Sequence, residues 1–371
     1  MSAARPITVT LCLTHNCNLR CRYCYAGRKT PCAMSRETAR AGMDLALEEA
    51  ARTGRSVDLS FFGGEPLLEW ELLQYCHDYL KERGGRLCKP PRFGITTNGT
   101  LLTEERLRWM AERDFLVGLS VDGNETMHDM NRRFADGGGS HAAVAKALEL
   151  LRAFPALRSK CICVVNAANC VHTADGVRWL HEHYDGPIGL NFDFWHEWND
   201  EQFAVLEEQL QQIQQMMLAA YRAGERVPQT ENIIGKIHSH LNGKGCGVCR
   251  FGEQEIAISA EGNLFPCSRL VGEGNSEAMN FGNVHTGIDR AKQTALIAAR
   301  GNSTPACKLC SLRHRCMNGC GCTNYAASGR IDRVSPFLCS TERLLIRLAD
   351  ELAETLYRER NAAFMAAFYG C

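Results

Sequence analysis

The sequence predicts an α/β fold with a parallel sheet over its first two-thirds, followed by a cysteine-rich region of different construction. Short apolar runs alternate with longer amphipathic stretches in the first part, which is typical of successive βα units. A cluster of three cysteines directly follows the first apolar run, where a strand would pass into a loop. Beyond about residue 224 the alternation gives way to a stretch rich in glycine and cysteine.

Six apolar runs are candidate strands, because they are rich in β-branched or aromatic residues and are bounded by turn residues. They cover residues 7–13, 57–62, 93–97, 116–121, 160–166 and 188–192. Apolar residues spaced three and four apart predict helices over residues 68–79, 206–217 and 342–368, and the first helix should begin after Ser35 and end at Gly54. Six βα units close only part of an eightfold barrel, and ligands of such folds gather at the carboxyl ends of the strands.

The composition limits the classes of protein that fit this chain. At 371 residues it is long enough for two domains, and its 42 basic and 42 acidic residues cancel. It has no long apolar run, and its start lacks the apolar core of a signal peptide. We therefore expect a cytoplasmic protein with no nucleic-acid or membrane partner. Its 20 cysteines then indicate metal clusters rather than disulfides.

The first cysteine cluster, Cys17, Cys21 and Cys24, has the spacing C-x3-C-x2-C. Three such thiolates can hold three irons of a 4Fe-4S cube and leave the fourth iron open to another ligand. A zinc site or buried thiols are the alternatives. The motif resembles that of the radical S-adenosylmethionine (SAM) enzymes. The resemblance implies a partial (β/α)6 barrel whose open iron binds SAM and whose activity is cleavage of SAM to a 5′-deoxyadenosyl radical.

Residues near two predicted strand ends also resemble SAM-binding segments of that family. Gly63, Gly64 and Glu65 match its GGE motif, which implies that their backbone and carboxylate hold the amino group of SAM. Two glycines also allow a ligand to touch the backbone there. The resemblance places Tyr23 beside the adenine. Asn98 lies in a family-like segment at the end of the third strand and is assigned no role.

The segment after the fourth predicted strand resembles two further family motifs. Ser120 matches a serine that contacts SAM, and Arg132 matches an arginine that pairs with the SAM carboxylate, a task suited to a planar guanidinium. The adjacent Arg133 is an alternative to Arg132. Alternatively, Arg132 and Arg133 are two solvated residues of a loop and bind no ligand.

A second set of cysteines follows, with the spacing C-x12-G-x4-C, then C-x2-C-x5-C-x3-C, then a final cysteine. Close-spaced soft thiolates favour a shared metal centre, iron-sulfur or zinc. The pattern matches the seven-cysteine signature of the SPASM extension of radical SAM proteins, which implies two auxiliary 4Fe-4S clusters and three clusters in all. By family precedent the ligands are Cys246, Cys249, Cys267 and Cys320 for the inner cluster and Cys307, Cys310, Cys316 and Cys339 for the outer one.

The inner cluster leaves two alternatives open. Cys322 could replace Cys320, and Cys246 lies outside the strict signature, so without it the inner cluster would keep an open iron. We expect a radical SAM barrel over residues 1–230 and a SPASM domain over residues 231–371. The chain beyond residue 224 is not expected to extend the barrel.

The resemblance implies hydrogen abstraction from a peptide or protein substrate. We expect a maturase of ribosomally made peptides that catalyses an oxidation, a crosslink or an epimerisation. The alternative enzyme is an anaerobic sulfatase-maturing enzyme, which makes formylglycine and carries an Asp after the second SPASM cysteine, where this chain has Ser268. A non-catalytic iron-sulfur electron-transfer protein is the alternative of another class.

The expected partners are a peptide or protein substrate and an external electron donor of flavodoxin or ferredoxin type. The first strand begins near residue 7, which leaves no room for the winged-helix recognition domain that many peptide-modifying relatives carry before the barrel. Leader recognition would then fall to a separate protein, or the substrate needs no leader. The sequence names no residue that handles the proton.

Overall fold

Two compact units, interleaved along the chain, make up the structure. The computed structural model describes residues 5–87, 89–241, 249–272, 276–300 and 305–370. The predicted division into residues 1–230 and 231–371 stays a prediction. Unit 1 comprises Met1–Ser120, Arg132–Ser159 and Arg250–Ala299, and unit 2 comprises Val121–Asn131, Lys160–Cys249 and Arg300–Cys371.

Unit 1 is built on a mainly parallel sheet. Its strands are β1 (Ile7–Cys12), β2 (Val57–Phe62), β3 (Arg92–Thr97), β4 (Leu116–Ser120), β7 (Glu255–Ile258) and β8 (Leu264–Phe265). They lie in the order β4-β3-β2-β1-β7-β8, all parallel except β8, which is antiparallel to β7. Cys12 is opposite Phe62 at the ends of β1 and β2, and Leu11 is opposite Ile258 at the ends of β1 and β7. The carboxyl ends of β1, β2 and β7 therefore meet at one edge.

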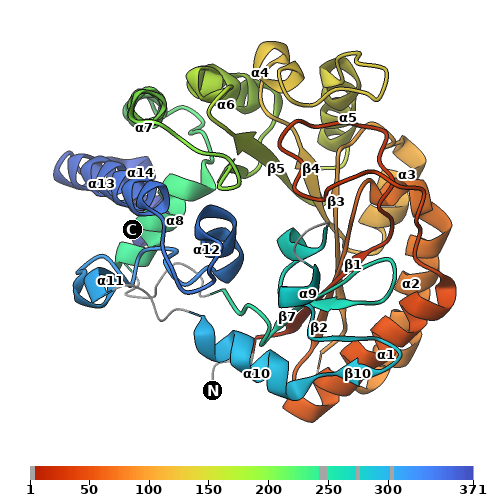
Figure 1. Cartoon of the computed structure of the whole chain (residues 1–371). Coiled ribbons are helices and arrows are strands. Elements are labelled where there is room, and N and C mark those ends of the chain that lie inside the picture. Colours follow the sequence, from red (N-terminus) through yellow and green to blue (C-terminus); the bar gives the residue numbers. More distant parts are fainter. Residues whose placement is uncertain (1–4, 88, 242–248, 273–275, 301–304, 371) are drawn as a thin grey trace. The chain divides into compact units, whose positions relative to one another are not determined.

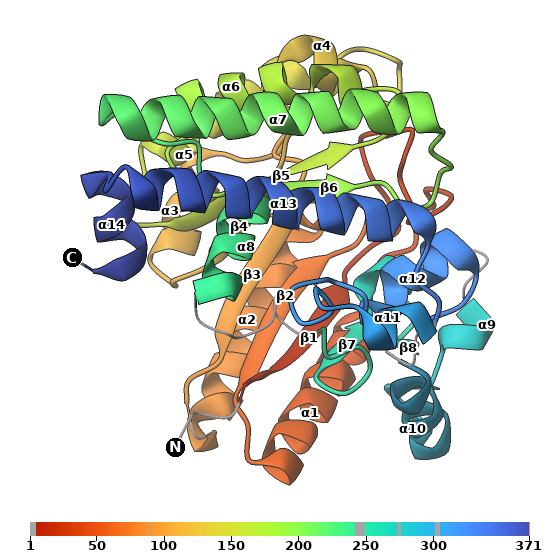
Figure 2. The ribbon, with the colours of Figure 1, turned by 90° about the vertical axis from the view of Figure 1, so that its left-hand side faces the viewer.

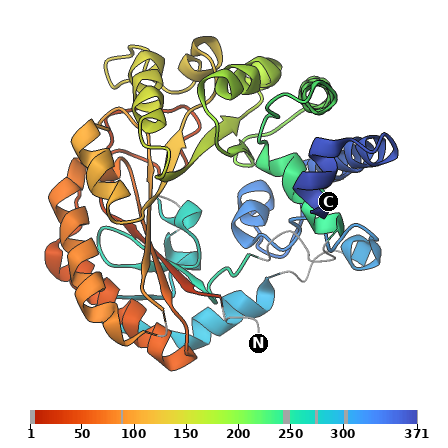
Figure 3. The same cartoon turned by 180° about the vertical axis from the view of Figure 1, so that it is seen from behind.

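The first helix of unit 1 has the predicted limits. α1 (Arg36–Thr53) begins after Ser35, whose hydroxyl accepts from the backbone of Thr38, and ends at Gly54 with a φ of 65°. It packs on β1 and β2 (Figures 1 and 3). The other helical segments and the small hairpin of unit 1 are η1 (Pro66–Glu69), α2 (Trp70–Arg83), η2 (Gly84–Arg86), α3 (Glu104–Ala111), α5 (His141–Arg152), η4 (Ser268–Leu270), α9 (Ser276–Met279), β9 (Gly282–Asn283), β10 (Gly287–Ile288) and α10 (Arg290–Ala299).

Unit 2 contains two parallel strands and most of the long helices. Its strands are β5 (Arg158–Val165), which begins in unit 1, and β6 (Ile188–Phe192). Its helical segments are α4 (Glu125–Asp129), η3 (Cys170–His172), α6 (Thr173–His183), α7 (Asp200–Ala223), α8 (Glu231–Leu241), α11 (Pro305–Leu309), α12 (Gly321–Ser328), α13 (Pro336–Arg358) and α14 (Ala362–Tyr369). Figure 2 shows α7 and α13 running side by side, where the Gln214 amide donates to the carbonyl of Leu348 at 2.9 Å.

The predicted α/β fold class, with a partial (β/α)6 barrel, is confirmed, and all six predicted strands are present. Two expectations are wrong. The chain beyond residue 224 does extend the sheet, because β7 pairs with β1; its four residues are too short an apolar run to stand out in the sequence. The tail is two helices rather than one, because Arg360 has a φ of 51° and Asn361 caps a new helix. Among the described residues, no helix is long and apolar enough to cross a membrane.

A buried ion pair holds the helices of unit 2 together. The Lys236 ammonium on α8 donates to the Glu342 carboxylate on α13 at 2.7 Å, and both side chains are 5% exposed. The same ammonium donates to the carbonyl of Arg315, and Glu342 also accepts from the backbone of Met317 at 2.6 Å. The pair therefore fixes the loop that carries Cys316 against two helices.

Replacing Lys236 with Met should destabilise the protein by about 3–5 kcal/mol, because it leaves the Glu342 carboxylate buried without its cation. Arg347→Met is the matched control, since the side chains of the Arg347–Glu207 pair on α13 and α7 are 49% and 35% exposed and the pair is expected to contribute about 0–1 kcal/mol. Thermal unfolding of both variants measures the difference. Equal melting temperatures would contradict the assigned role of the buried pair.

Candidate functional site

Cys17, Cys21 and Cys24 lie on one loop that leaves the carboxyl end of β1. Cys17 is buried and the other two are partly exposed. The backbone N–H of Cys24 donates to the carbonyl of Cys21 at 3.2 Å, which closes a tight turn between these two ligands. The loop is held from its other side by a backbone hydrogen bond from Arg20 to Arg133 at 2.7 Å. Backbone hydrogen bonds thus hold the segment that carries the three thiols at Arg20 and at Cys24.

The two glycines after β2 pack directly against this cysteine loop. The N–H of Gly64 donates to the carbonyl of Thr14 at 2.7 Å, and the N–H of Glu65 donates to that of Asn16 at 2.9 Å. Gly63 has a φ of 127°, a conformation that favours glycine. A Cβ added to Gly64 would lie 1.9 Å from the carbonyl oxygen of Asn16. Both glycines are therefore required by the close approach of two backbones, whatever they do for a ligand.

The Glu65 side chain is fully buried and its carboxylate is occupied by hydrogen bonds. One oxygen accepts from the Thr97 hydroxyl at 2.7 Å and from the backbone of Leu67 at 3.0 Å, and the other accepts from the backbone of Asn98 at 2.8 Å. Burial raises the pKa of this carboxyl, while the Asn98 hydrogen bond opposes the shift. These three hydrogen bonds fix the Glu65 carboxylate between the turn after β2 and the end of β3.

Asn98, which the sequence left without a role, contacts the cysteine loop. Its amide nitrogen donates to the Asn18 side chain at 2.9 Å and lies 3.7 Å from the Cys17 sulfur. A second donor, the Lys29 ammonium, lies 2.9 Å from the Cys24 sulfur. An amide nitrogen and an ammonium group therefore lie beside two of the three sulfurs. No spacing rule in the sequence points to either contact.

Arg132 lies over the aromatic ring of Tyr23, which belongs to the cysteine loop. The Arg132 guanidinium carbon lies 5.3 Å from the centre of the Tyr23 ring, and both side chains are buried. Arg133 is exposed and donates to the carbonyl of Gly137. This geometry favours Arg132 over Arg133 for a ligand near the cysteine loop. Ser120 is the last residue of β4 and is partly exposed.

The second set of cysteines is divided between the two units. Cys267 belongs to unit 1, whereas the other described ligands of this set belong to unit 2. Cys246 lies outside the described residues. The sulfurs of Cys320 and Cys322 are 3.5 Å apart and both side chains are buried, so their burial does not separate the two alternatives. Burial and the nearby Glu342 carboxylate raise the pKa of Cys316 to about 12, so a metal bound there must displace a tightly held proton.

The residues around the first cysteine loop fit an iron-sulfur cluster with an open iron. Three soft sulfur donors share one loop. The fourth cysteine of the connection between β1 and α1, Cys32, lies outside the motif, and its sulfur is 3.4 Å from the Glu261 carboxylate. The amide of Asn98 and the ammonium of Lys29 lie where they would offset the negative charge of a thiolate-bound cluster. The buried Arg132 guanidinium supplies a partner for a carboxylate.

Residues 11–162, which include the end of β1, strands β2 to β4 and this cysteine loop, match the model of the radical SAM superfamily. The chain contains a radical SAM domain. A radical SAM domain implies a 4Fe-4S cluster and SAM. An uncharacterized protein of Methanocaldococcus jannaschii is 33% identical to this chain in a match that covers 38% of this chain and 47% of that protein.

Longer matches extend beyond the radical SAM domain. The cysteine-type anaerobic sulfatase-maturating enzyme of Clostridium perfringens is 23% identical over 82% of this chain and 85% of that enzyme. The solved structure of anSMEcpe with bound AdoMet and Cp18Cys peptide has a TM-score of 0.79 at 20% identity, covering 95% of this chain and 99% of that one. The structure of Streptococcus suis SuiB bound to precursor peptide SuiA has a TM-score of 0.60 at 15% identity, covering 90% of this chain and 76% of that one. These structural matches establish a shared fold.

Gly64→Ala should disturb the cysteine loop, because the added methyl group meets the Asn16 carbonyl and a backbone shift costs about 1–3 kcal/mol. After reconstitution we expect the variant to contain about four fewer iron atoms per chain than the wild type. Gly235→Ala in α8 is the control, since its added methyl group meets nothing within 4 Å. Iron analysis of the purified proteins measures the effect, and equal iron contents would refute it.

Asn98→Ala should make the cluster harder to reduce, because a hydrogen bond to a thiolate stabilises the more negative, reduced state. Asn18→Ala is the control, since it leaves the Asn98 amide free to face the Cys17 sulfur. A redox titration followed by electron paramagnetic resonance (EPR) gives both potentials. The role assigned to Asn98 fails if the potential of Asn98→Ala equals that of the wild type.

Proposed function

We propose that this protein is a radical SAM enzyme that modifies a peptide or protein substrate. The observation that carries the proposal is the cysteine loop of the radical SAM domain, packed on the Gly63–Gly64 turn beside the buried pair of Arg132 and Tyr23. The cysteine loop offers three sulfur ligands, the glycine turn offers backbone groups, and Arg132 offers a cation for a carboxylate. A SAM site needs all three. A non-catalytic electron-transfer protein would not need the arginine.

Each part of this site has a proposed task. Cys17, Cys21 and Cys24 hold the cluster, and the backbone of Gly63 and Gly64 accepts the amino group of SAM. Arg132 pairs with the SAM carboxylate, Ser120 contacts SAM, and Tyr23 lies beside the adenine. The Glu65 carboxylate is proposed to accept from the same amino group. When cluster and SAM are bound, they supply a 5′-deoxyadenosyl radical that abstracts hydrogen from the substrate.

The second set of cysteines is proposed to hold two auxiliary 4Fe-4S clusters, which would accept an electron from the substrate radical or bind the substrate. The ligands are Cys246, Cys249, Cys267 and Cys320 for one cluster and Cys307, Cys310, Cys316 and Cys339 for the other. Cys322 is an alternative to Cys320. An external donor of flavodoxin or ferredoxin type would supply the reducing electron. A separate protein would recognise a leader peptide, or the substrate is small or needs no leader.

The substrate class is proposed from two kinds of relative. The solved neighbours include an enzyme with a bound cysteine-containing peptide and one bound to a precursor peptide. Maturation of a ribosomally made peptide is the leading proposal, because Ser268 follows Cys267 where the sulfatase-maturing group carries an Asp. Formylglycine formation is the second candidate, favoured by the sequence match that spans 82% of this chain.

Arg132→Gln should raise the SAM concentration needed for half-maximal 5′-deoxyadenosine formation by about 10- to 100-fold, because a charge-assisted hydrogen bond contributes about 1.5–3 kcal/mol. Arg133→Gln is the matched control and should behave like the wild type, since that side chain is exposed. Reconstituted protein, a chemical reductant and chromatographic detection of 5′-deoxyadenosine provide the measurement. Equal effects of both substitutions would reject Arg132 as the carboxylate partner.

The substrate proposals are separated by mass spectrometry. Reconstituted protein that makes 5′-deoxyadenosine is incubated with precursor peptides encoded beside its gene and with a Cys-x-Pro-x-Arg peptide. A mass change in a precursor supports the peptide maturase, and conversion of the cysteine to formylglycine supports the second candidate. If SAM is cleaved and every peptide keeps its mass, the peptide proposal is rejected.

A further inference from the structure

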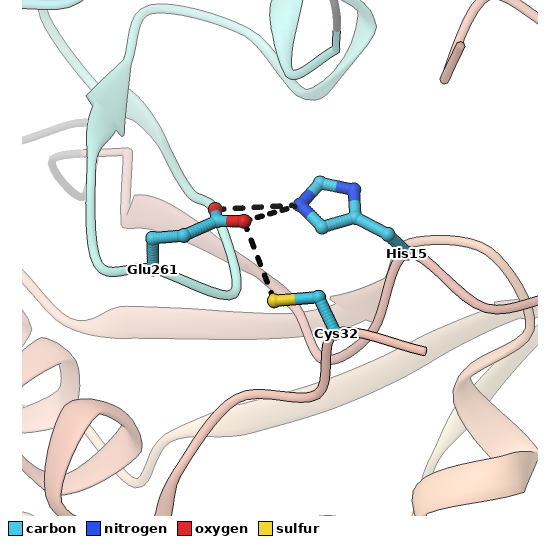
Figure 4. Close-up of side chains that lie close together, drawn as sticks. All are labelled: His15, Cys32 and Glu261. Carbon is cyan, nitrogen blue, oxygen red and sulfur yellow. Dashed lines mark hydrogen bonds and ion pairs between the residues drawn. The ribbon is translucent and has the colours of Figure 1, made fainter. Parts of the chain in front are cut away.

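Three metal-ligating side chains that belong to neither cysteine set converge beside the first cysteine loop. Figure 4 shows His15, Cys32 and Glu261 pointing toward one another. The Nε2 atom of His15 is 3.1 Å from one carboxylate oxygen of Glu261 and 3.3 Å from the other. The Cys32 sulfur is 3.4 Å from the nearer oxygen, and all three ligand atoms lie within 4.8 Å of one another. All three residues belong to unit 1.

The fold, rather than the side chains alone, creates this convergence. His15 follows β1, and its backbone N–H donates to the carbonyl of Cys32 at 2.9 Å, so these two segments are bonded side by side. Glu261 lies in the turn between β7 and β8, and β7 is parallel to β1, so this turn reaches the same edge of the sheet. The Asn283 side chain donates to the Glu261 carbonyl at 3.2 Å and holds the turn. Three separate segments are thus positioned before any ion binds.

We propose that His15, Cys32 and Glu261 form a binding site for one divalent transition-metal ion of the zinc type. One imidazole, one thiolate and one carboxylate are a ligand set that suits Zn²⁺. With Zn–N and Zn–O bonds of about 2.0–2.2 Å and a Zn–S bond of about 2.3 Å, ligand atoms of a tetrahedral site lie roughly 3.3–3.6 Å apart. The two distances from the Glu261 carboxylate, 3.1 Å to His15 and 3.4 Å to Cys32, are close to that spacing.

The site leaves a coordination position for solvent or a small ligand. Three protein ligands leave one tetrahedral position open, as in catalytic rather than structural zinc sites. The His15 side chain is 18% exposed and that of Glu261 is 50% exposed, so the ion can be reached from solvent. His15 is also only two residues from Cys17, so an ion bound here would stiffen the start of the cysteine loop. This inference does not depend on the proposed peptide substrate.

The test uses the reconstituted holoenzyme, passed over a chelating resin and then equilibrated with Zn²⁺. We expect one zinc per chain that survives gel filtration. Its zinc-edge X-ray absorption should fit one sulfur at about 2.3 Å with nitrogen and oxygen at about 2.0–2.1 Å. A shell of three or four sulfurs would place the zinc in one of the cysteine motifs and overturn the proposal. Absence of retained zinc would leave the three groups as a hydrogen-bonded cluster and also overturn it.

Variants locate the ion. Cys32→Ser and Glu261→Gln should each weaken zinc binding by about tenfold or more while keeping the iron content and circular dichroism of the wild type. Cys170→Ser, a thiol in unit 2, and Glu277→Gln, an exposed carboxylate, are the matched controls and should retain zinc. Glu261 lies on a partly exposed turn, so its variant tests the site even where Cys32→Ser folds poorly. Zinc retention equal to that of the controls in Glu261→Gln would refute the assignment.

Discussion

The candidate SAM site depends on the buried carboxylate of Glu65. Its hydrogen bonds to Leu67, Thr97 and Asn98 join the turn after β2 to the end of β3. The same turn is bonded through its backbone to the start of the cysteine loop, and Asn98 extends toward the Cys17 sulfur. One buried acid therefore connects the glycine turn, the end of β3 and the first cluster ligand, and none of these can move alone.

Unit 2 also contains a buried carboxylate that accepts a hydrogen bond from a backbone N–H near a cysteine. There the buried carboxylate of Glu342 accepts from the backbone of Met317, next to Cys316, and is neutralised by Lys236. In each unit a buried acid accepts a backbone N–H close to a candidate cluster ligand. The two carboxylates differ in their partners, because Glu342 has a buried ammonium at 2.7 Å, whereas Glu65 is held mainly by neutral donors. Burial is therefore the main cause of the raised pKa of Glu65.

Much of the architecture was predictable from local signals, because strands such as residues 57–62 are long, apolar and bounded by turns, and α1 carries a serine cap and a terminal glycine. The cysteine loop and the glycine turn were predictable from spacing. The position of β7 was not, since its pairing with β1 is a contact between residues about 250 apart in sequence. The role of Asn98 and the His15–Cys32–Glu261 cluster were missed for the same reason, because these contacts form only when distant segments meet. The contact of Lys29 with Cys24 is local, but a single lysine carries no spacing signal.

The central claim is that SAM binds the open iron of the cluster held by Cys17, Cys21 and Cys24, on the loop that Glu65 fixes. The most direct measurement is electron-nuclear double resonance on the reduced holoenzyme with SAM isotopically labelled at its amino nitrogen. The account predicts a magnetic coupling between the cluster and the labelled nitrogen, together with a changed EPR spectrum when SAM is added. An unchanged spectrum without nitrogen coupling, in protein that holds its full complement of iron, would contradict it.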